Sequence, residues 1–246
     1  EYCLTTNALS KRYGDFKALE NLSMHVPKGS IYGFVGKNGA GKTTLIRLIC
    51  GMQSPTSGAY TLYGTEHTDR NISRVRRRMG AVVETPSIYT ELTAEENIKE
   101  QYRVLGMPSF DGVDDLLRTV GLAETGKKRA KDFSLGMRQR LGIAIALCGE
   151  PDFLVLDEPV NGLDPQGIIE MRELILKLNR ERQITVLISS HILDELSRIA
   201  THYGFLHRGV MVKEISAAEL AGVCRKCVRL TVNDTGLLCP ALDGMG

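Results

Sequence analysis

A short glycine-rich segment carries the residue types needed to hold a chain of phosphates. The segment Gly36-Lys-Asn-Gly-Ala-Gly-Lys-Thr-Thr44 has glycines at positions 36, 39 and 41. Backbone N–H groups must curl inward around phosphate oxygens, and side chains at these positions would obstruct them. Lys42 can reach the β- and γ-phosphates, and the Thr43 hydroxyl can ligate Mg²⁺. The predicted nucleotide-binding residues here are Gly36, Asn38, Gly39, Ala40, Gly41, Lys42, Thr43 and Thr44.

Two adjacent carboxylates form a second candidate group. Asp157 and Glu158 directly follow the apolar run 153–156. A carboxylate at the end of such a strand can hold Mg²⁺, and its neighbour can polarise a water against the γ-phosphate. Taken alone, Asp157 and Glu158 also fit an ordinary turn or helix start. The phosphate loop earlier in the chain favours the catalytic interpretation.

The elements that must position these residues follow an α/β pattern, because apolar β-branched runs alternate with amphipathic stretches. Polar residues follow each expected strand, as they do where ligands bind in an open parallel sheet. Strands are predicted over 30–35, 153–156 and 184–188, with a helix after the phosphate loop that ends near Gly51. A helical insert is predicted between about 93 and 149, with helices over 94–105, 112–120 and 136–148, and a further strand is possible over 228–232.

Composition excludes several other classes of protein. The chain has 246 residues, 43% of them hydrophobic and 24% charged, which is typical of one large or two small globular domains. A net charge of +2 gives no reason to expect wholesale nucleic-acid binding. No apolar stretch approaches 18 residues, and the N-terminal residues do not form a secretory signal. The densest basic run, 70–78, is expected to be a solvated helix face rather than a contact with phospholipid or an acidic partner.

Six cysteines without dense spacing favour a reducing compartment over a secreted disulfide scaffold. Cys224 and Cys227 form a C-x-x-C pattern, which could be a redox pair or half of a zinc site. No second ligand pair lies nearby, so two incidental thiols are the favoured interpretation.

The order and spacing of the segments resemble the ATP-binding subunits of ABC transporters over nearly all of residues 2–215. The matching positions are Tyr13, the loop 36–44, Glu84, the signature-like segment 133–140, Asp157 with Glu158, the segment 161–164 and His191. Within that family the chain is most similar to subunits of bacitracin and lantibiotic exporters. The resemblance implies a P-loop NTPase (RecA-like) core with a small antiparallel β subdomain and an inserted α-helical subdomain. The implied division is 1–92 and 150–221 for the core with its β subdomain, 93–149 for the helical subdomain, and 222–246 for a truncated C-terminal extension.

The resemblance also assigns roles to single residues. Tyr13 would stack on adenine, although it could be an ordinary strand-edge tyrosine. Ser134 and Gly136 would contact the γ-phosphate of ATP held by an opposite subunit. Asp164 would lie at the seam of that dimer, although it also fits a solvated turn. The implied catalytic residues are Lys42, Glu158 and His191, and the implied metal ligands are Thr43, Glu84 and Asp157.

Two positions depart from the usual family pattern. The segment 133–137 reads Phe-Ser-Leu-Gly-Met where most members have Leu-Ser-Gly-Gly-Gln, so Ser134 and Gly136 are retained but the glutamine is lost. Glu84 stands where most members carry glutamine. A carboxylate there can still ligate Mg²⁺, but it adds negative charge beside the phosphates. We therefore expect an altered dependence of ATP hydrolysis on Mg²⁺ or an altered turnover.

The function implied by the resemblance is ATP hydrolysis that closes and reopens a head-to-tail dimer holding two MgATP. The chain would lie at the cytoplasmic face of the membrane, and closure would drive a conformational change in an attached integral membrane permease. The cargo would be a peptide antibiotic or drug, exported from the cell, and no nucleic-acid partner is expected. The alternative is a soluble ABC-type ATPase of DNA repair or translation. Phe133 follows Lys42 by only 91 positions, which leaves no room for the long coiled coil of repair members, and one phosphate loop argues against the two cassettes of translation members. A small-molecule P-loop kinase would leave the signature segment and His191 unexplained.

Overall fold

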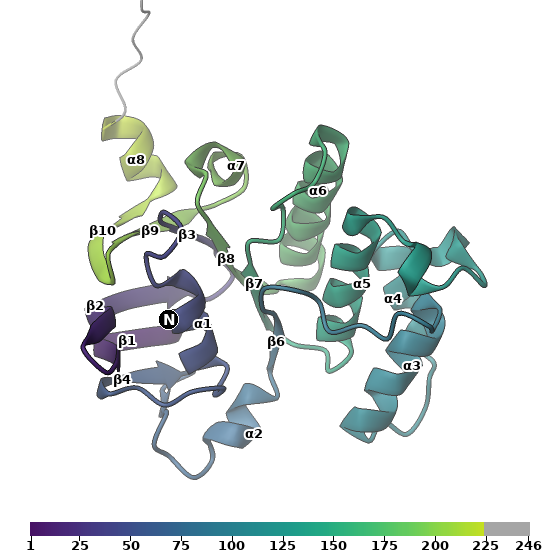
Figure 1. Cartoon of the computed structure of the whole chain (residues 1–246), viewed down its shortest axis with the longest axis horizontal. Helices are drawn as coiled ribbons and strands as arrows, with labels where there is room; N and C mark the ends of the chain where they lie inside the picture. The colour runs from purple at the N-terminus through teal and green to yellow at the C-terminus, as the bar shows by residue number, and fades with distance from the viewer. Residues whose placement is uncertain (224–246) are drawn as a thin grey trace, which may run out of the picture.

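The computed structural model describes residues 1–223, and a six-stranded sheet lies at its centre (Figure 1). The strand order is β10-β9-β3-β8-β7-β6, and every neighbouring pair is parallel except the edge pair β9 and β10. The strands are β3 (Ile31–Val35), β6 (Met79–Val82), β7 (Phe153–Asp157), β8 (Thr185–Ser190), β9 (His202–His207) and β10 (Val210–Ser216). The three predicted strands are confirmed to within two residues at each end, and the α/β class is confirmed with them.

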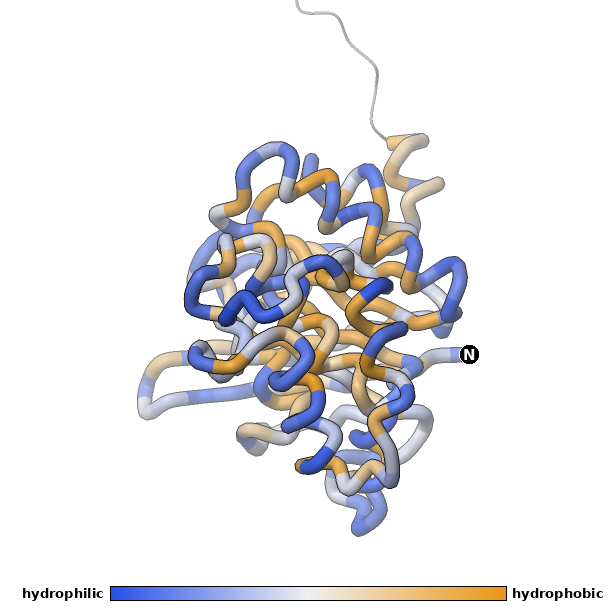
Figure 2. Tube along the Cα trace, turned by 90° about the vertical axis from the view of Figure 1, so that its right-hand side faces the viewer, coloured by the Kyte–Doolittle hydropathy of each residue, from blue (hydrophilic) through white to orange (hydrophobic). Residues whose placement is uncertain are grey.

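The central strands are buried on both faces, which explains their continuous apolar runs. Successive side chains of a strand point to opposite faces. Leu154 and Leu156 of β7 therefore pack in one core cluster, while Phe153 and Val155 pack in another. In the tube coloured by hydropathy, apolar segments run through the interior and polar ones form the outer turns (Figure 2). The sheet thus separates two hydrophobic cores.

One core joins the central sheet to helix α1 (Lys42–Ile49) and to a smaller antiparallel sheet. The smaller sheet has the order β2-β1-β4-β5. Its strands are β1 (Tyr2–Tyr13), β2 (Phe16–Pro27), β4 (Ser57–Leu62) and β5 (Thr65–Glu66). This sheet is the small antiparallel part that the resemblance implies. It places the start of β2 beside the phosphate loop, where Gly41 closely approaches the backbone of Ala18.

The remaining large helices pack in the other core. Three of them come between β6 and β7 in the sequence, although these two strands are neighbours in the sheet. These three are α3 (Ala94–Leu105), α4 (Val113–Thr119) and α5 (Leu135–Leu147), and they gather on the side of the central sheet away from the antiparallel sheet (Figure 1). The Thr93 side chain accepts from Glu96 N, the Glu96 side chain accepts from Thr93 N, and Gly106 ends α3 in a left-handed conformation. The predicted helices are confirmed to within a residue or two of their ends.

The chain also forms α6 (Pro165–Arg182), α7 (Leu193–Ser197), α8 (Ala217–Val223) and, within the basic run, α2 (Ile72–Arg76). Arg74 and Arg77 are exposed, as predicted for a solvated face. Arg78 is exposed as well, and it pairs with Asp152. For Arg76 the prediction is wrong, because its side chain is half-buried and donates to the Tyr60 hydroxyl. These contacts fasten the segment around α2 to its neighbours.

The possible strand over 228–232 and the pair Cys224 and Cys227 lie outside the described residues. Within residues 1–223, no helix combines the length and apolar character that crossing a bilayer requires.

Candidate nucleotide site

The phosphate loop joins β3 to α1, and its glycines meet steric demands that other residues would not. Gly39 and Gly41 have φ of +78° and +109°, in the region that side chains disfavour. A Cβ at Gly36 would lie 2.7 Å from the Leu206 carbonyl oxygen, and one at Gly41 would lie 2.5 Å from the Ala18 carbonyl oxygen. The first N–H groups of α1 have no partner inside the helix and lie at its positive dipole end. The loop is therefore built for close approach of an anion.

The Lys42 ammonium is buried at the centre of this loop. Its side chain is 5% exposed, and Nζ donates to the Gly36 carbonyl oxygen at 2.5 Å and to the Lys37 carbonyl oxygen at 3.3 Å. Nζ also lies 3.1 Å from Glu158 Oε1. At the other end of α1, burial raises the pKa of Cys50 to about 12, so this thiol stays protonated at neutral pH.

Asp157 lies at the carboxyl end of β7 and is held by two hydroxyl groups. Thr43 Oγ1 donates to its Oδ2 at 2.8 Å, and Ser189 Oγ donates to its Oδ1 at 2.6 Å. Asp157 and Ser189 are register partners on the parallel strands β7 and β8. The predicted ligands Thr43 and Asp157 are therefore brought together, although 114 residues separate them.

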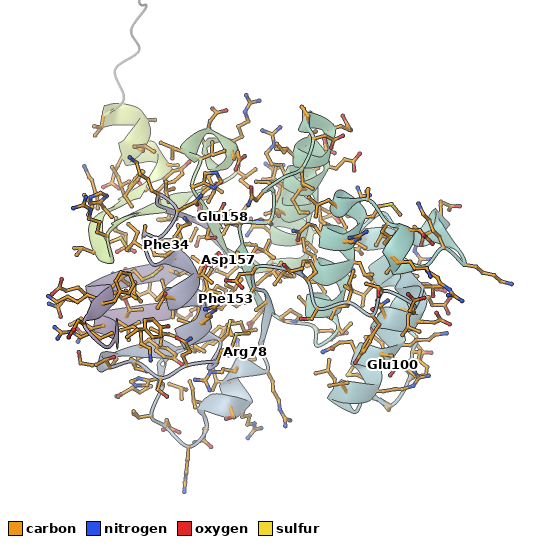
Figure 3. The ribbon with its side chains drawn as sticks, viewed as in Figure 1. Phe34, Arg78, Glu100, Phe153, Asp157 and Glu158 are labelled. Carbon is orange, nitrogen blue, oxygen red and sulfur yellow. The ribbon has the colours of Figure 1, made fainter. Side chains whose placement is uncertain are left out.

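Glu158 and His191 meet beside the lysine (Figure 3 labels Asp157 and Glu158). His191 Nδ1 lies 2.7 Å from Glu158 Oε2. The contact of Lys42 with Oε1 is an ion pair without hydrogen-bond alignment, so buried Oε1 has no hydrogen-bond donor among the described residues. Glu158 also has a φ of +50°, an unusual conformation for a non-glycine residue. A buried carboxylate oxygen with free acceptor capacity can take a hydrogen bond or a proton from water.

The residues present fit Mg²⁺ in the chemistry of their donors. A hydroxyl and a carboxylate oxygen, Thr43 Oγ1 and Asp157 Oδ2, lie together at the loop, and Mg²⁺ prefers oxygen ligands. Within residues 1–223, no three His, Cys, Asp or Glu side chains form a cage that could hold a metal unaided. Mg²⁺ usually takes one or two protein oxygens together with substrate phosphates and water, and Thr43 and Asp157 supply two such oxygens.

Glu84, the third predicted ligand, makes a different contact. It follows β6, is exposed, and pairs with Arg47 of α1 at 2.7 Å. No hydrogen bond joins it to Thr43 or to Asp157 among the described residues.

A pocket of about 280 Å³ opens over the phosphate loop. Its lining includes the predicted residues Asn38, Gly39, Gly41, Lys42, Thr43, Thr44 and Glu158. Phe16 and Ala18 of β2 also line it, and neither was predicted. Tyr13 does not line it: its hydroxyl bonds to Gln53, and Lys11 Nζ lies 5.2 Å from its ring centroid. The stacking role of Tyr13 stays a prediction. The exposed Phe16, its cross-strand neighbour, is the aromatic side chain that the pocket contains.

The signature segment lies in a different pocket, of about 400 Å³. Ser134, Gly136 and Asp164 line it together, so the structure brings these three predicted residues to one place. Ser134 caps α5 by accepting from Met137 N, and Asp164 caps α6 by accepting from Gly167 N. The two pockets share no lining residue. The predicted nucleotide-binding residues of this chain are therefore divided between two separate pockets.

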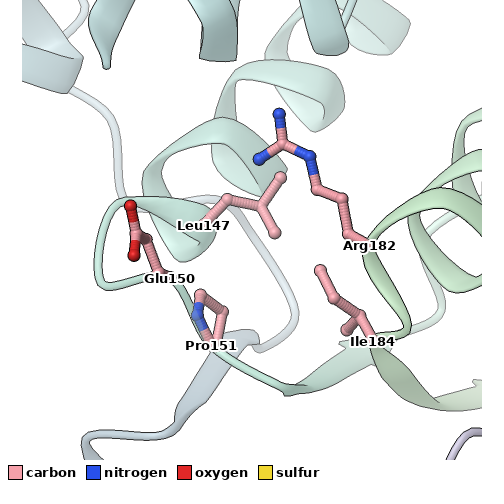
Figure 4. Close-up of a pocket in the computed structure, with 5 residues that line it drawn as sticks. All are labelled: Leu147, Glu150, Pro151, Arg182 and Ile184. Atoms are coloured by element: carbon pink, nitrogen blue, oxygen red, sulfur yellow. The ribbon is translucent and has the colours of Figure 1, made fainter. Parts of the chain in front are cut away.

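Two further hollows contain none of the predicted site residues. One, of about 220 Å³, lies between the end of α5 and the end of α6, with Glu150 and Arg182 at its rim (Figure 4). The other, of about 660 Å³, lies between α2, β6, α3 and α5, and includes Val104, Leu105 and Met107.

The sequence signals for the unpredicted residues were weak. Ser189 belongs to a polar pair at the end of an apolar strand, but its bond to Asp157 depends on the register of β7 with β8. Phe16 follows the two-residue turn after Tyr13, and only the fold shows that it faces the phosphate loop.

Comparison with known proteins agrees with this geometry. The sequence profile of the ABC transporter family matches residues 19–161, which is more than half of the chain. The bacitracin transport ATP-binding protein BcrA of Bacillus licheniformis is 45% identical over 94% of this chain and 75% of its own length. The lantibiotic transport ATP-binding protein SrtF of Streptococcus pyogenes is 43% identical over 86% of this chain and 90% of its own.

Solved structures show the same architecture. A nucleotide-free ATP-binding cassette from an ABC transporter superposes with a TM-score of 0.79 at 25% identity, over 91% of this chain and 95% of its own. A dimeric cassette in a post-hydrolysis state, bound to ADP and Pi, has a TM-score of 0.77 at 23% identity, over 87% of this chain and 98% of its own, and shows the fold alone. The chain belongs to the ABC transporter family, as one of its ATP-binding, ATP-hydrolysing subunits.

Proposed function

We propose that two copies of this chain bind head to tail and enclose two MgATP between them. The observation that carries the proposal is the separation of the two half-sites. Lys42 and Glu158 line one pocket, while Ser134, Gly136 and Asp164 line another with no residue in common. A second copy that presents its signature pocket to the phosphate loop would complete the site.

Within such a site, Lys42 stabilises negative charge on the β- and γ-phosphates. To do so its ammonium exchanges the loop carbonyl oxygens and Glu158 for phosphate oxygens. Glu158 Oε1 accepts a hydrogen bond from the attacking water, and His191 fixes the other carboxylate oxygen through Nδ1.

Thr43 and Asp157 would hold Mg²⁺ together with phosphate oxygens, and Ser189 orients Asp157 by bonding its second oxygen. When bound, Mg²⁺ neutralises charge on the phosphates. Glu84 is a further ligand in this proposal, provided that its carboxylate leaves Arg47.

The partner that uses this closure is proposed to be an integral membrane permease, which would hold the chain at the cytoplasmic face of the membrane. The contact is proposed at the hollow of about 660 Å³ between α2 and α3. Val104 and Leu105 are 73% and 45% exposed there, an unusual exposure for apolar side chains. The same hollow includes Ala81 of β6, the strand that leads to Glu84.

The cargo is proposed to be a peptide antibiotic, moved outward. The support is the printed function of the similar proteins, bacitracin transport and lantibiotic transport. Expression together with the cognate permease in a sensitive bacterium should raise the inhibitory concentration of one such peptide, and Lys42→Ala should abolish the increase.

Mixing two inactive variants tests the head-to-tail arrangement. Lys42→Ala damages the phosphate loop, and Gly136→Asp damages the signature. A mixed dimer contains one site built from the intact half of each chain. We expect each variant alone to be nearly inactive and the mixture to regain ATPase activity. Absence of any regain, with both variants folded and the wild type active, would contradict the arrangement.

A further inference from the structure

The carboxylate of Glu84 has a partner that the sequence did not indicate. Arg47 Nη2 donates to Glu84 Oε1 at 2.7 Å. Arg47 belongs to α1, whereas Glu84 follows β6, so the ion pair joins two separate segments. Glu84 has a φ of +57°, which its own side chain disfavours, so its surroundings fix this conformation.

Helix geometry places this ion pair beside the proposed metal site. Thr43 and Arg47 are four residues apart in α1, so their side chains lie on the same face, about 6 Å apart along the axis. The Thr43 hydroxyl bonds to Asp157, on the side of the proposed Mg²⁺. Glu84 is therefore held on the neighbouring turn, within reach of a change of partner.

We infer that Arg47 is a positioning residue whose guanidinium competes with Mg²⁺ for the Glu84 carboxylate. The inference rests on the proposed function, since it takes Thr43 and Asp157 as the metal site. A carboxylate bound to a guanidinium has to break that ion pair before it can serve a metal. Arg47 consequently raises the Mg²⁺ concentration that nucleotide binding requires, and it moderates the extra negative charge that Glu84 brings.

The expected change in the Mg²⁺ requirement depends on how exposed the ion pair of Arg47 and Glu84 is. The side chains of Arg47 and Glu84 are 37% and 57% exposed. Exposed ion pairs contribute modestly and are weakened by salt. Removing the guanidinium should therefore shift the Mg²⁺ requirement about two- to fivefold, and less at high ionic strength.

The test is the Mg²⁺ dependence of binding a fluorescent ATP analogue, measured in a Glu158→Gln background to suppress hydrolysis. Arg47→Gln should lower the half-saturating Mg²⁺ concentration about two- to fivefold. Arg47→Lys, which keeps the charge, should stay closer to the parent. In a chain that also carries Glu84→Gln, Arg47→Gln should have no effect, because the carboxylate for which Arg47 competes is gone.

Two results would overturn the inference while the proposed function stands. The first is that the parent chain needs Mg²⁺ to bind nucleotide, but Arg47→Gln leaves its half-saturating Mg²⁺ concentration unchanged or raises it. An equal shift with and without Glu84→Gln is the second, since it would mean that Arg47 acts independently of Glu84. Binding that needs no Mg²⁺ in the parent chain would instead overturn the proposed metal site, and the inference with it. Thermal unfolding of each variant controls for folding.

Discussion

At the scale of single residues, the site depends on hydroxyl and carboxylate groups that fix one another. Asp157 is 2% exposed, and both of its oxygens accept from hydroxyl groups. Ser189 Oγ both donates to Asp157 and accepts from Glu158 N at 2.9 Å. One serine thereby sets the position of the two acidic residues.

Ser189→Ala should weaken both folding and catalysis. The substitution leaves a carboxylate oxygen and a backbone N–H without their partner where the side chain is fully buried. We expect a loss of about 1–3 kcal/mol in the free energy of unfolding, measured by urea denaturation. The exposed Ser197→Ala is the control and should change it by less than about 0.5 kcal/mol. Equal stability of the two variants would contradict this role of Ser189.

The residue types and spacing of two short segments predicted Lys42, Thr43, Asp157 and Glu158 as site residues, and the structure brings these four side chains together. Contacts between distant segments could not be predicted in this way. The place of Phe16 in the pocket over the phosphate loop, and the pairing of Arg47 with Glu84, depend on how strands and helices pack. The sequence predicted which groups are present but not every partner that holds them.

At the scale of elements, close packing joins the helices between β6 and β7 to the central sheet. A Cβ at Gly80 of β6 would lie 2.2 Å from the Ala146 carbonyl oxygen of α5. A Cβ at Gly142 of α5 would lie 2.6 Å from Pro86, in the segment after Glu84. Helix α5 begins at the signature segment, so these two glycines position that segment relative to Glu84.

Gly80→Ala should destabilise the protein, because the added methyl group forces α5 away from β6. The expected loss is about 1–3 kcal/mol in the free energy of unfolding. Gly222→Ala, where a Cβ meets nothing within 4 Å, is the matched control and should be neutral or slightly stabilising. Similar unfolding curves for the two variants would show that β6 and α5 are not as tightly packed as described.

Helix α3 was predictable because its ends are encoded locally, by Thr93 and Glu96 at its start and Gly106 at its end.

The carboxylate of Glu96, which caps helix α3, predicts a response of stability to acid. Its hydrogen bonds to Thr93 lower the pKa of Glu96 below 4.5. A carboxyl group whose pKa is lower in the folded state stabilises the fold at pH values above its ordinary pKa. This contribution is lost as the pH falls through the pKa of the folded state. Glu96→Gln should therefore lose less stability than the wild type below about pH 4.5. An identical acid-unfolding curve would contradict the capping role.

At the scale of the whole molecule, the predicted site residues lie in two separate pockets, and a third hollow exposes apolar side chains. The α/β class and the parallel strands could be predicted from apolar periodicity. The strand order β10-β9-β3-β8-β7-β6 could not, because it depends on which segments pack together over long separations. The division into subdomains stays a prediction that rests on family resemblance.

The proposed contact with a permease predicts a selective loss of assembly. Leu105→Asp places a charge in the hollow between α2 and α3 and should reduce co-purification with the permease from membranes. Val212→Asp, at a 66% exposed apolar position on β10, is the control and should co-purify normally. ATP hydrolysis by either isolated variant should remain unchanged. Equal recovery of the permease with both variants would place the contact elsewhere.

The proposed function depends most on Glu158, which would activate water for ATP hydrolysis in a closed dimer. The most direct measurement compares Glu158→Gln with the wild type for ATP binding, dimer formation by light scattering, and turnover. Removing the carboxylate should leave MgATP binding and dimerisation intact and lower turnover about 10²- to 10⁴-fold, as expected for loss of a general base. Near-normal turnover by Glu158→Gln would show that the Glu158 carboxylate is not the general base.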